Sequence, residues 1–210
     1  TCKVYGIDKE DKYCLKKIHS MLIASQNLSN YGVPVPKNTI FRINLAWTNT
    51  LDELKTLLQK HKEHDIFVDL PIHRTKPPNN KYSLEDIIPI FQSNTNVKYL
   101  AISNVESFND LKKYLDLLPS SITLIPKIES PTGVNNIEKI MNAIPSDQKI
   151  VMLDHDDLYS SMLKNHEPSI NFISYVNKLV EYCTKNNIIL LRTIGVIFSD
   201  EEKRITEYVN

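Results

Sequence analysis

The chain has 210 residues, and its 25 Lys and Arg residues balance 25 Asp and Glu residues, so the formal net charge is zero. This length suits one domain with a sizeable core, and the neutral balance argues against nucleic acid or an anionic membrane as partner. No apolar run approaches the roughly 20 residues needed to cross a bilayer, so we expect a single soluble, cytoplasmic domain over residues 1–210.

Apolar segments typical of strands alternate with amphipathic helices along the chain. The first predicted strand covers residues 2–7, and a helix with apolar positions at Leu15, Ile18, Met21 and Leu22 follows it until the proline-containing segment 31–36. Further strands are predicted at 39–47, 65–70, 97–103, 122–129, 149–154 and 187–192. Residues 155–168 are expected to form a loop before the next helix.

Seven strand–helix units with apolar, non-alternating strands predict a parallel sheet that is covered on both faces. Seven units are one short of a closed (β/α)8 barrel of the TIM type. The eighth strand would lie beyond residue 210 in a longer natural chain, come from a partner, or be replaced by the amino-terminal segment. An open doubly wound parallel sheet is the alternative. The first residue is Thr rather than Met, which suggests that residues are missing at the amino end, and the same is open at the carboxyl end.

Polar side chains gather where the predicted strands end. In chain order they are Arg42 and Asn44, Asp69, Ser103, Lys127 and Glu129, residues 154–157, and Arg192 with Thr193. Each has an ordinary explanation, such as a cap for the next loop or an ion pair between Arg42 and Asp69. In a barrel, however, all these strand ends meet at one mouth, where such enzymes carry out their chemistry.

Lys127 and Glu129 are two residues apart in the fifth predicted strand, so their side chains share one face, roughly 6–7 Å apart along the strand. One of them can bind a metal ion while the other meets a developing negative charge. An ion pair on the rim of the sheet is the simpler reading of a lone Lys-x-Glu. His61 and His64 have helical i, i+3 spacing and could also bind a metal, but no third ligand lies nearby in the sequence.

Six segments, in order, resemble the catalytic barrel of pyruvate kinase and, more widely, the phosphoenolpyruvate/pyruvate barrels. The most specific is Ile125-Pro-Lys-Ile-Glu-Ser-Pro-Thr-Gly-Val134, which is similar to the family's Ala-Lys-Ile-Glu-Asn-x-x-Gly-Val motif. Val151-Met-Leu-Asp-His-Asp-Asp-Leu158 is similar to its metal-binding Arg-Gly-Asp-Leu loop, and Phe41-Arg-Ile-Asn-Leu-Ala-Trp47 to its Arg-x-Asn-Phe-Ser-His strand. The other three segments are residues 1–7, which look like the family's first strand, Ile66-Phe-Val-Asp69 with Arg74-Thr75, and Ala101-Ile-Ser-Asn-Val105.

The resemblance implies a role for each matched position. Glu129 and Asp157 would bind Mg²⁺ or Mn²⁺, and Lys127 would stabilise an enolate. Arg42 would meet a phosphate or second anionic group, while the amides near Asp156 and Asp157, with the Thr193 hydroxyl, would hold the substrate carboxylate. Ser103, Asn44 and Arg74 are further substrate-binding candidates, and Asn44 with Asp69 is what remains of a monovalent-cation site. A change of Lys127 to Ala is expected to leave folding nearly intact.

The chain also departs from the pyruvate kinase pattern. We expect neither the lid domain nor the carboxy-terminal domain of that family. Ala46, Trp47 and Leu70 replace polar residues, and His155-Asp156 replaces Arg-Gly. Because only four glycines occur, no glycine-rich phosphate loop can be written. ATP synthesis is therefore not expected.

Two functions from different classes follow. One is a metal-dependent enzyme that binds pyruvate, another 2-oxo acid or phosphoenolpyruvate and uses enolpyruvate chemistry, as an aldolase, a lyase or a phosphoenolpyruvate-dependent transferase; a partner chain would supply the lid of a phosphotransferase. The other is a non-catalytic binding or assembly module with the same fold, and metal titration distinguishes the two. Homo-oligomerisation is left open.

Overall fold

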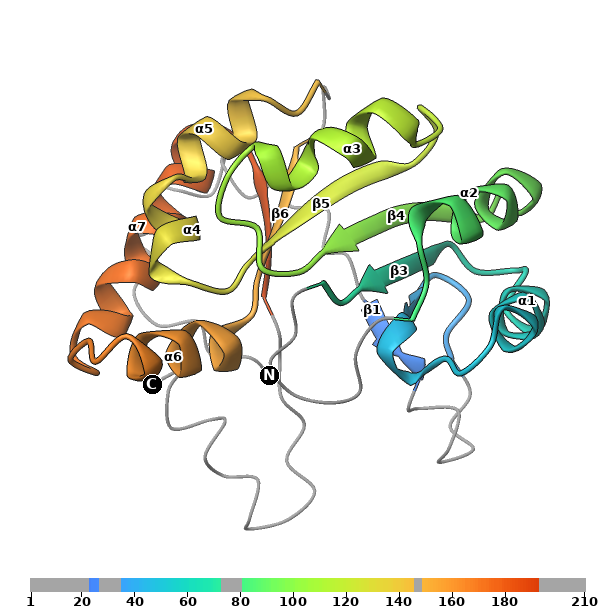
Figure 1. Cartoon of the computed structure of the whole chain (residues 1–210), viewed down its shortest axis with the longest axis horizontal. Coiled ribbons are helices and arrows are strands. Elements are labelled where there is room, and N and C mark those ends of the chain that lie inside the picture. Colours follow the sequence, from blue (N-terminus) through green and yellow to red (C-terminus); the bar gives the residue numbers. More distant parts are fainter. Residues whose placement is uncertain (1–22, 27–34, 73–80, 146–148, 193–210) are drawn as a thin grey trace, which may run out of the picture.

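The computed structural model describes residues 23–26, 35–72, 81–145 and 149–192, and within these ranges seven parallel strands form one sheet (Figure 1). The strands are β1 (Ile23–Ser25), β2 (Ile40–Asn44), β3 (Ile66–Leu70), β4 (Val97–Ile102), β5 (Thr123–Ile128), β6 (Ile150–Leu153) and β7 (Ile189–Arg192). The helices are the short 3-10 helix η3 (Leu45–Trp47), α1 (Leu51–Lys60), α2 (Leu84–Ser93), α3 (Asn109–Leu117), α4 (Pro131–Asn135), α5 (Ile137–Asn142), α6 (His155–Lys164) and α7 (Asn171–Lys185).

The strands stand in the sheet in the order in which they occur in the chain, from β1 to β7, and each pairs in parallel with the next. The sheet curls into a half-barrel of the TIM type, which confirms the predicted α/β fold. The alternative of a doubly wound sheet is wrong, because such a sheet reverses its strand order at a switch point and this one does not. Among the described residues, no helix has the length and apolarity to cross a membrane.

Two segments differ from the prediction. The predicted strand at 2–7 and the apolar positions Leu15 to Leu22 lie outside the described residues, but β1 occupies Ile23–Ser25, where the first helix was expected to continue. A short apolar run suits a helix or a strand equally, and pairing with β2 decides in favour of the strand. The expected loop at 155–168 is also wrong in its first part, because α6 begins directly after β6 with Asp154 as its N-cap.

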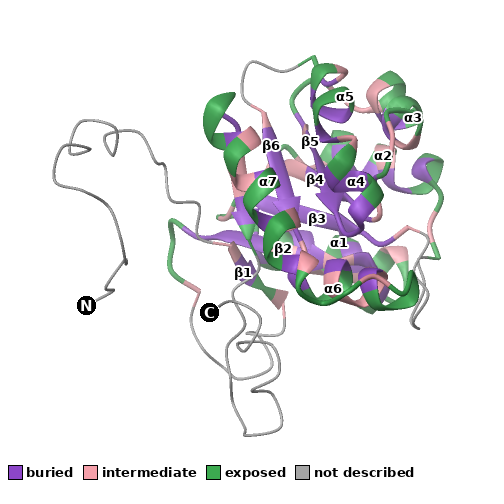
Figure 2. Cartoon of the chain, turned by 90° about the vertical axis from the view of Figure 1, so that its left-hand side faces the viewer, coloured by how far each residue is buried: buried purple, intermediate pink, exposed green. Residues whose placement is uncertain are grey.

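The two faces of the sheet bury different apolar layers. The face toward the helices packs side chains such as Phe41, Val68 and Leu100 against helix residues, and the helices expose their outer sides (Figure 2). In the part of the chain that the structure describes, the layer on the opposite, inner face is built from strand residues. Its buried members are Ile40, Phe67, Ala101, Ile125, Ile150, Met152 and Leu191.

A polar layer lies above this inner apolar layer, toward the carboxyl ends of the strands. Side chains alternate between the faces of a strand, so residues two positions after inner apolar ones point to the same side. The members of this polar layer are Arg42, Asp69, Ser103 and Lys127, followed by Glu129 and Asp154 just beyond their strands. The fold therefore collects polar groups from five neighbouring strands at one mouth.

Candidate metal and substrate site

Lys127 is the centre of the polar layer and is almost fully buried, at 4% exposure. Its Nζ lies 2.8 Å from Glu129 Oε1 and 3.4 Å from Asp69 Oδ2, and it donates a hydrogen bond to Ser103 Oγ at 3.1 Å. Burial by itself lowers the pKa of Lys127, but the nearby charges of Asp69 and Glu129 outweigh it and raise that pKa above its ordinary value. Lys127 is therefore a protonated, fixed cation rather than a base or a nucleophile.

Asp69 anchors this cation from β3. Its carboxylate is completely buried and forms ion pairs with both Arg42 and Lys127. Burial by itself raises the pKa of Asp69, but the charges of Lys127 and Arg42 outweigh this effect and hold that pKa below its ordinary value. The ion pair between Arg42 and Asp69 that the sequence suggested is thus present.

Asn44 and Asp69, the two residues that match the family's monovalent-cation site, both contact protein groups in the structure. The side-chain oxygen of Asn44 accepts a hydrogen bond from the Ala46 amide at 2.9 Å and caps η3. The carboxylate of Asp69, which lies beside Asn44 in the paired strands, already faces two side-chain cations. These contacts argue against a monovalent cation held by Asn44 and Asp69.

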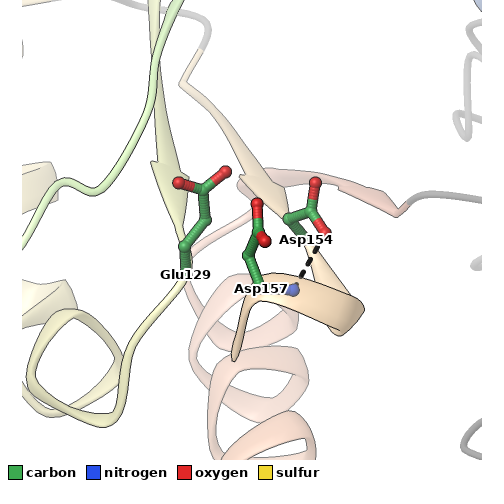
Figure 3. A group of neighbouring side chains, drawn as sticks. All are labelled: Glu129, Asp154 and Asp157. Atoms are coloured by element: carbon green, nitrogen blue, oxygen red, sulfur yellow. Dashed lines mark hydrogen bonds between the residues drawn. The ribbon is translucent and has the colours of Figure 1, made fainter. Parts of the chain in front are cut away.

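Three carboxylates converge on one another (Figure 3), and one of them, Glu129, pairs with Lys127. Glu129, Asp154 and Asp157 each offer an oxygen, and these oxygens all lie within 4.8 Å of one another. Glu129 follows β5, while the other two begin α6, where Asp154 Oδ1 accepts the Asp157 amide at 3.3 Å. Asp154 was part of the predicted strand-end cluster but not a predicted metal ligand; its position directly after a strand, at a helix N-cap, is the signal that could have found it.

Glu129 is the most buried member of this acidic triad, at 2% exposure. Burial, together with the charges of Asp154 and Asp157, raises the pKa of Glu129 to about 7 against the opposing effect of Lys127. Its Oε2 accepts the amide of Asn104 at 2.7 Å. Asn104 has a φ of 52°, a left-handed conformation that Asn tolerates, and its contact with Glu129 was not foreseen from the sequence.

With all four of its carboxylates ionised, the site carries an excess of negative charge. Arg42 and Lys127 supply two positive charges, whereas Asp69 and the acidic triad supply four negative charges when all are ionised. The difference is −2, the charge that one divalent cation neutralises. Carboxylate oxygens are the ligands that Mg²⁺, Mn²⁺ and Ca²⁺ prefer, so these side chains could hold such an ion.

The remaining predicted site residues are only partly brought together. Ser103 contacts Lys127, and exposed Asp156 lies in the first turn of α6, but the Asp157 amide expected to hold a substrate carboxylate is bonded to Asp154. Arg74 and Thr193 lie outside the described residues.

Arg192 and His155, both in the predicted strand-end cluster, pair with each other on the helix-facing side of the sheet. Arg192 donates from Nε to His155 Nε2 at 3.2 Å, and the His155 ring lies near Phe172 of α7. Burial and the charge of Arg192 lower the pKa of His155. This pair therefore lies behind the polar layer rather than in it.

The fold and the polar mouth define the class: a TIM-type half-barrel with a buried lysine and an acidic cluster at the carboxyl ends of its strands. No family model and no curated protein matches the chain. Among solved structures, RipC from Yersinia pestis is similar, with a TM-score of 0.57 and 18% identity over 90% of this chain and 84% of that one. A malate synthase from Haloferax volcanii, solved as a lead(II) complex, has a TM-score of 0.63 and 10% identity over 90% of this chain and 66% of that one. These similarities establish the fold.

Proposed function

We propose that this chain is a divalent-metal-dependent enzyme that binds pyruvate or phosphoenolpyruvate and uses enolpyruvate chemistry, as a lyase, an aldolase or a phosphoenolpyruvate-dependent transferase. The observation that carries the proposal is the acidic triad next to a buried, protonated lysine, with Lys127 Nζ 2.8 Å from Glu129 Oε1. The similarity in fold to a malate synthase supports an enzyme of this general kind.

Glu129, Asp154 and Asp157 would hold Mg²⁺ or Mn²⁺. When bound, the ion would polarise the 2-oxo group of the substrate as a Lewis acid. Asp154 is thus proposed as a third ligand beside the predicted ligands Glu129 and Asp157. Since Lys127 pairs with Glu129, a substrate oxygen close to the triad would also be close to the lysine ammonium group.

Lys127 would stabilise the negative charge that develops on the substrate oxygen when a methyl proton of pyruvate passes to solvent and an enolate forms. A fixed cation in a buried site does not have to reorient when the charge develops, and it stabilises that charge far more strongly than a cation in water does. Asp69 and Ser103 act as positioning residues, because both contact Lys127 Nζ and hold it in place. Arg42 would bind a second anionic group from the same layer, using the donors that do not contact Asp69.

The test is exchange of the methyl protons of pyruvate with deuterated solvent, followed by proton NMR in the presence of Mg²⁺ or Mn²⁺. Lys127→Ala should slow the exchange at least about a hundredfold. The structure gives a reason to expect lower stability of Lys127→Ala than the sequence suggested, because the variant leaves the buried carboxylate of Asp69 without one of its two cations. A loss of about 3–5 kcal/mol in the free energy of unfolding is expected. Lys127→Arg keeps the charge with altered geometry, and exposed Lys112→Ala serves as the matched control.

Exchange that does not need a metal ion, or that proceeds unchanged in folded Lys127→Arg and Lys127→Ala, contradicts the proposal. Absence of exchange in a wild-type protein that still binds Mn²⁺ favours the non-catalytic binding module instead.

A further inference from the structure

A second group of potential ligands lies at the opposite end of the sheet, in the turn between α1 and β3. His61 is the C-cap residue of α1 and is only 7% exposed. Its ring stacks on buried Phe41, with centroids 3.6 Å apart and an interplanar angle of 13°. The ring of His61 also meets the ring of His64, with centroids 5.7 Å apart and an interplanar angle of 62°. The turn thus places two imidazoles side by side at the amino ends of the strands.

Three nitrogens of these two rings are buried without a hydrogen-bond partner among the described residues. They are Nε2 of His61 and both Nδ1 and Nε2 of His64. A buried polar atom left in this state costs about 1–3 kcal/mol, and an unsatisfied group in a folded protein calls for an explanation such as a bound ion. Imidazole nitrogens of this kind are available as ligands.

The backbone of the turn is fixed in a way that favours binding. The side-chain amide of Asn96 donates to the carbonyl oxygens of both His61 and His64, at 3.4 and 3.3 Å. The His64 amide also donates to the His61 carbonyl at 3.0 Å. Because the turn is held at both histidines, a ligand would not have to order it.

We propose that His61 and His64 bind a borderline transition-metal ion, such as Ni²⁺, Cu²⁺ or Zn²⁺, at a structural site separate from the carboxylate site at the mouth. Imidazole suits these ions, whereas hard cations such as Mn²⁺ and Mg²⁺ prefer carboxylate oxygen. Two imidazole nitrogens bound to one ion each lie about 2.0–2.1 Å from it. The ring centroids of His61 and His64 lie 5.7 Å apart, so the His64 ring would have to turn to aim one of its nitrogens at the same ion as His61, and water would complete the coordination.

The surroundings are compatible with a bound cation. Lys60 and Lys62 are balanced by Glu63 and Asp65 in the same segment. Burial, with the nearby charges of His64 and Lys60, lowers the pKa of His61, so its ring is neutral at pH 7 and keeps a lone pair for a metal. Bound metal would tie the end of α1 to the start of β3 and so stabilise the fold at the end remote from the mouth.

The experiment is calorimetric titration of the whole chain with Ni²⁺, together with thermal unfolding in its presence and absence. We expect one equivalent to bind and to raise Tm, and His61→Gln and His64→Gln each to weaken binding at least tenfold and to abolish the rise. Should His61→Gln not fold, His64→Gln decides, since His64 is only partly buried. His166→Asn is the matched control, because His166 is exposed and its φ of 57° suits Asn.

Titration with Mn²⁺ separates this site from the one at the mouth. Glu129→Gln should no longer bind Mn²⁺ but should still bind Ni²⁺. His64→Gln should still bind Mn²⁺ but should bind Ni²⁺ more weakly. Absence of Ni²⁺ binding in the wild type, or equal Ni²⁺ binding in the wild type, His61→Gln and His64→Gln, would overturn the proposal whatever the result at the mouth.

Discussion

At the scale of single residues, the site is a set of buried charges that determine one another. Lys127 remains protonated because Asp69 and Glu129 face it, and Asp69 remains ionised because Arg42 and Lys127 face it. Glu129 is the exception, since burial and two neighbouring carboxylates raise its pKa to about 7 against the pull of Lys127. It is therefore the member of the acidic triad whose protonation state changes in the physiological range.

This raised pKa makes metal binding depend on pH. A carboxylate must lose its proton before it binds a cation, so Mn²⁺ affinity should be highest above about pH 7 and fall by up to about tenfold per unit below that. Glu129→Gln should abolish binding, whereas exposed Glu138→Gln should bind like the wild type. Calorimetry between pH 5.5 and pH 8 would measure this; an affinity that is constant over the range, or unchanged in Glu129→Gln, would show that Glu129 is not a ligand.

At the scale of secondary-structure elements, short helices place the site residues. Asp154 caps α6 and, through the same carboxylate, belongs to the acidic triad. Ser130 caps α4 by accepting the Gly133 amide at 3.1 Å, so that the helix starts two residues after Glu129. Each cap starts a helix directly after a strand, which keeps Glu129 at the end of β5 and Asp154 at the end of β6.

The two roles of Asp154 can be separated by substitution. Asn caps a helix about as well as Asp but brings no negative charge, so Asp154→Asn should keep its stability and bind Mn²⁺ more weakly. Asp154→Ala should lose both, with a drop of about 0.5–2 kcal/mol in the free energy of unfolding. Urea unfolding and Mn²⁺ titration of both variants would measure this, and equal Mn²⁺ affinity in Asp154→Asn and the wild type would remove Asp154 from the metal site.

Gly133 is required by close packing of α4 against the loop after β4. A Cβ at this position would lie 2.6 Å from the carbonyl oxygen of Val105. That backbone is itself fixed, because the Val105 amide donates to the Lys127 carbonyl at 3.1 Å. Gly133→Ala should therefore lower the free energy of unfolding by about 1–3 kcal/mol in urea titrations, with exposed Thr132→Ala close to the wild type. A fully stable Gly133→Ala would mean that α4 shifts freely.

At the scale of the whole molecule, the curl of the sheet brings distant strand ends together. In a flat sheet Arg42 on β2 and Asp154 after β6 would be about 19 Å apart, at four strand spacings. In this chain the charge of Asp154 contributes to raising the pKa of Arg42. The curl therefore creates a shared electrostatic site from residues that are more than a hundred positions apart.

The molecule as a whole also offers little for a nucleotide. Its four glycines cannot form a glycine-rich phosphate loop, and the segment between β3 and α2 is too short to carry a lid domain. We expect ADP and ATP to bind no more tightly than about millimolar, both with and without Mg²⁺. Micromolar affinity in a calorimetric titration of the chain would contradict this expectation.

Several features of the protein follow from the sequence by itself because they depend on local periodicity. Alternation along a strand places Lys127 and Glu129 on one face, and repeated apolar strands with intervening helices predict a parallel sheet; six of the seven predicted strands lie where β2 to β7 are found. The tertiary structure decided what depends on contacts between distant segments. Pairing with β2 made Ile23–Ser25 a strand, and the pairing of β3, β4 and β5 placed Asp69 and Ser103 beside Lys127. The start of α6 directly after β6 placed Asp154 near Glu129. Burial, which turns these neighbours into a site with shifted pKa values, is a property of the packed molecule and has no counterpart in the order of residues along the chain.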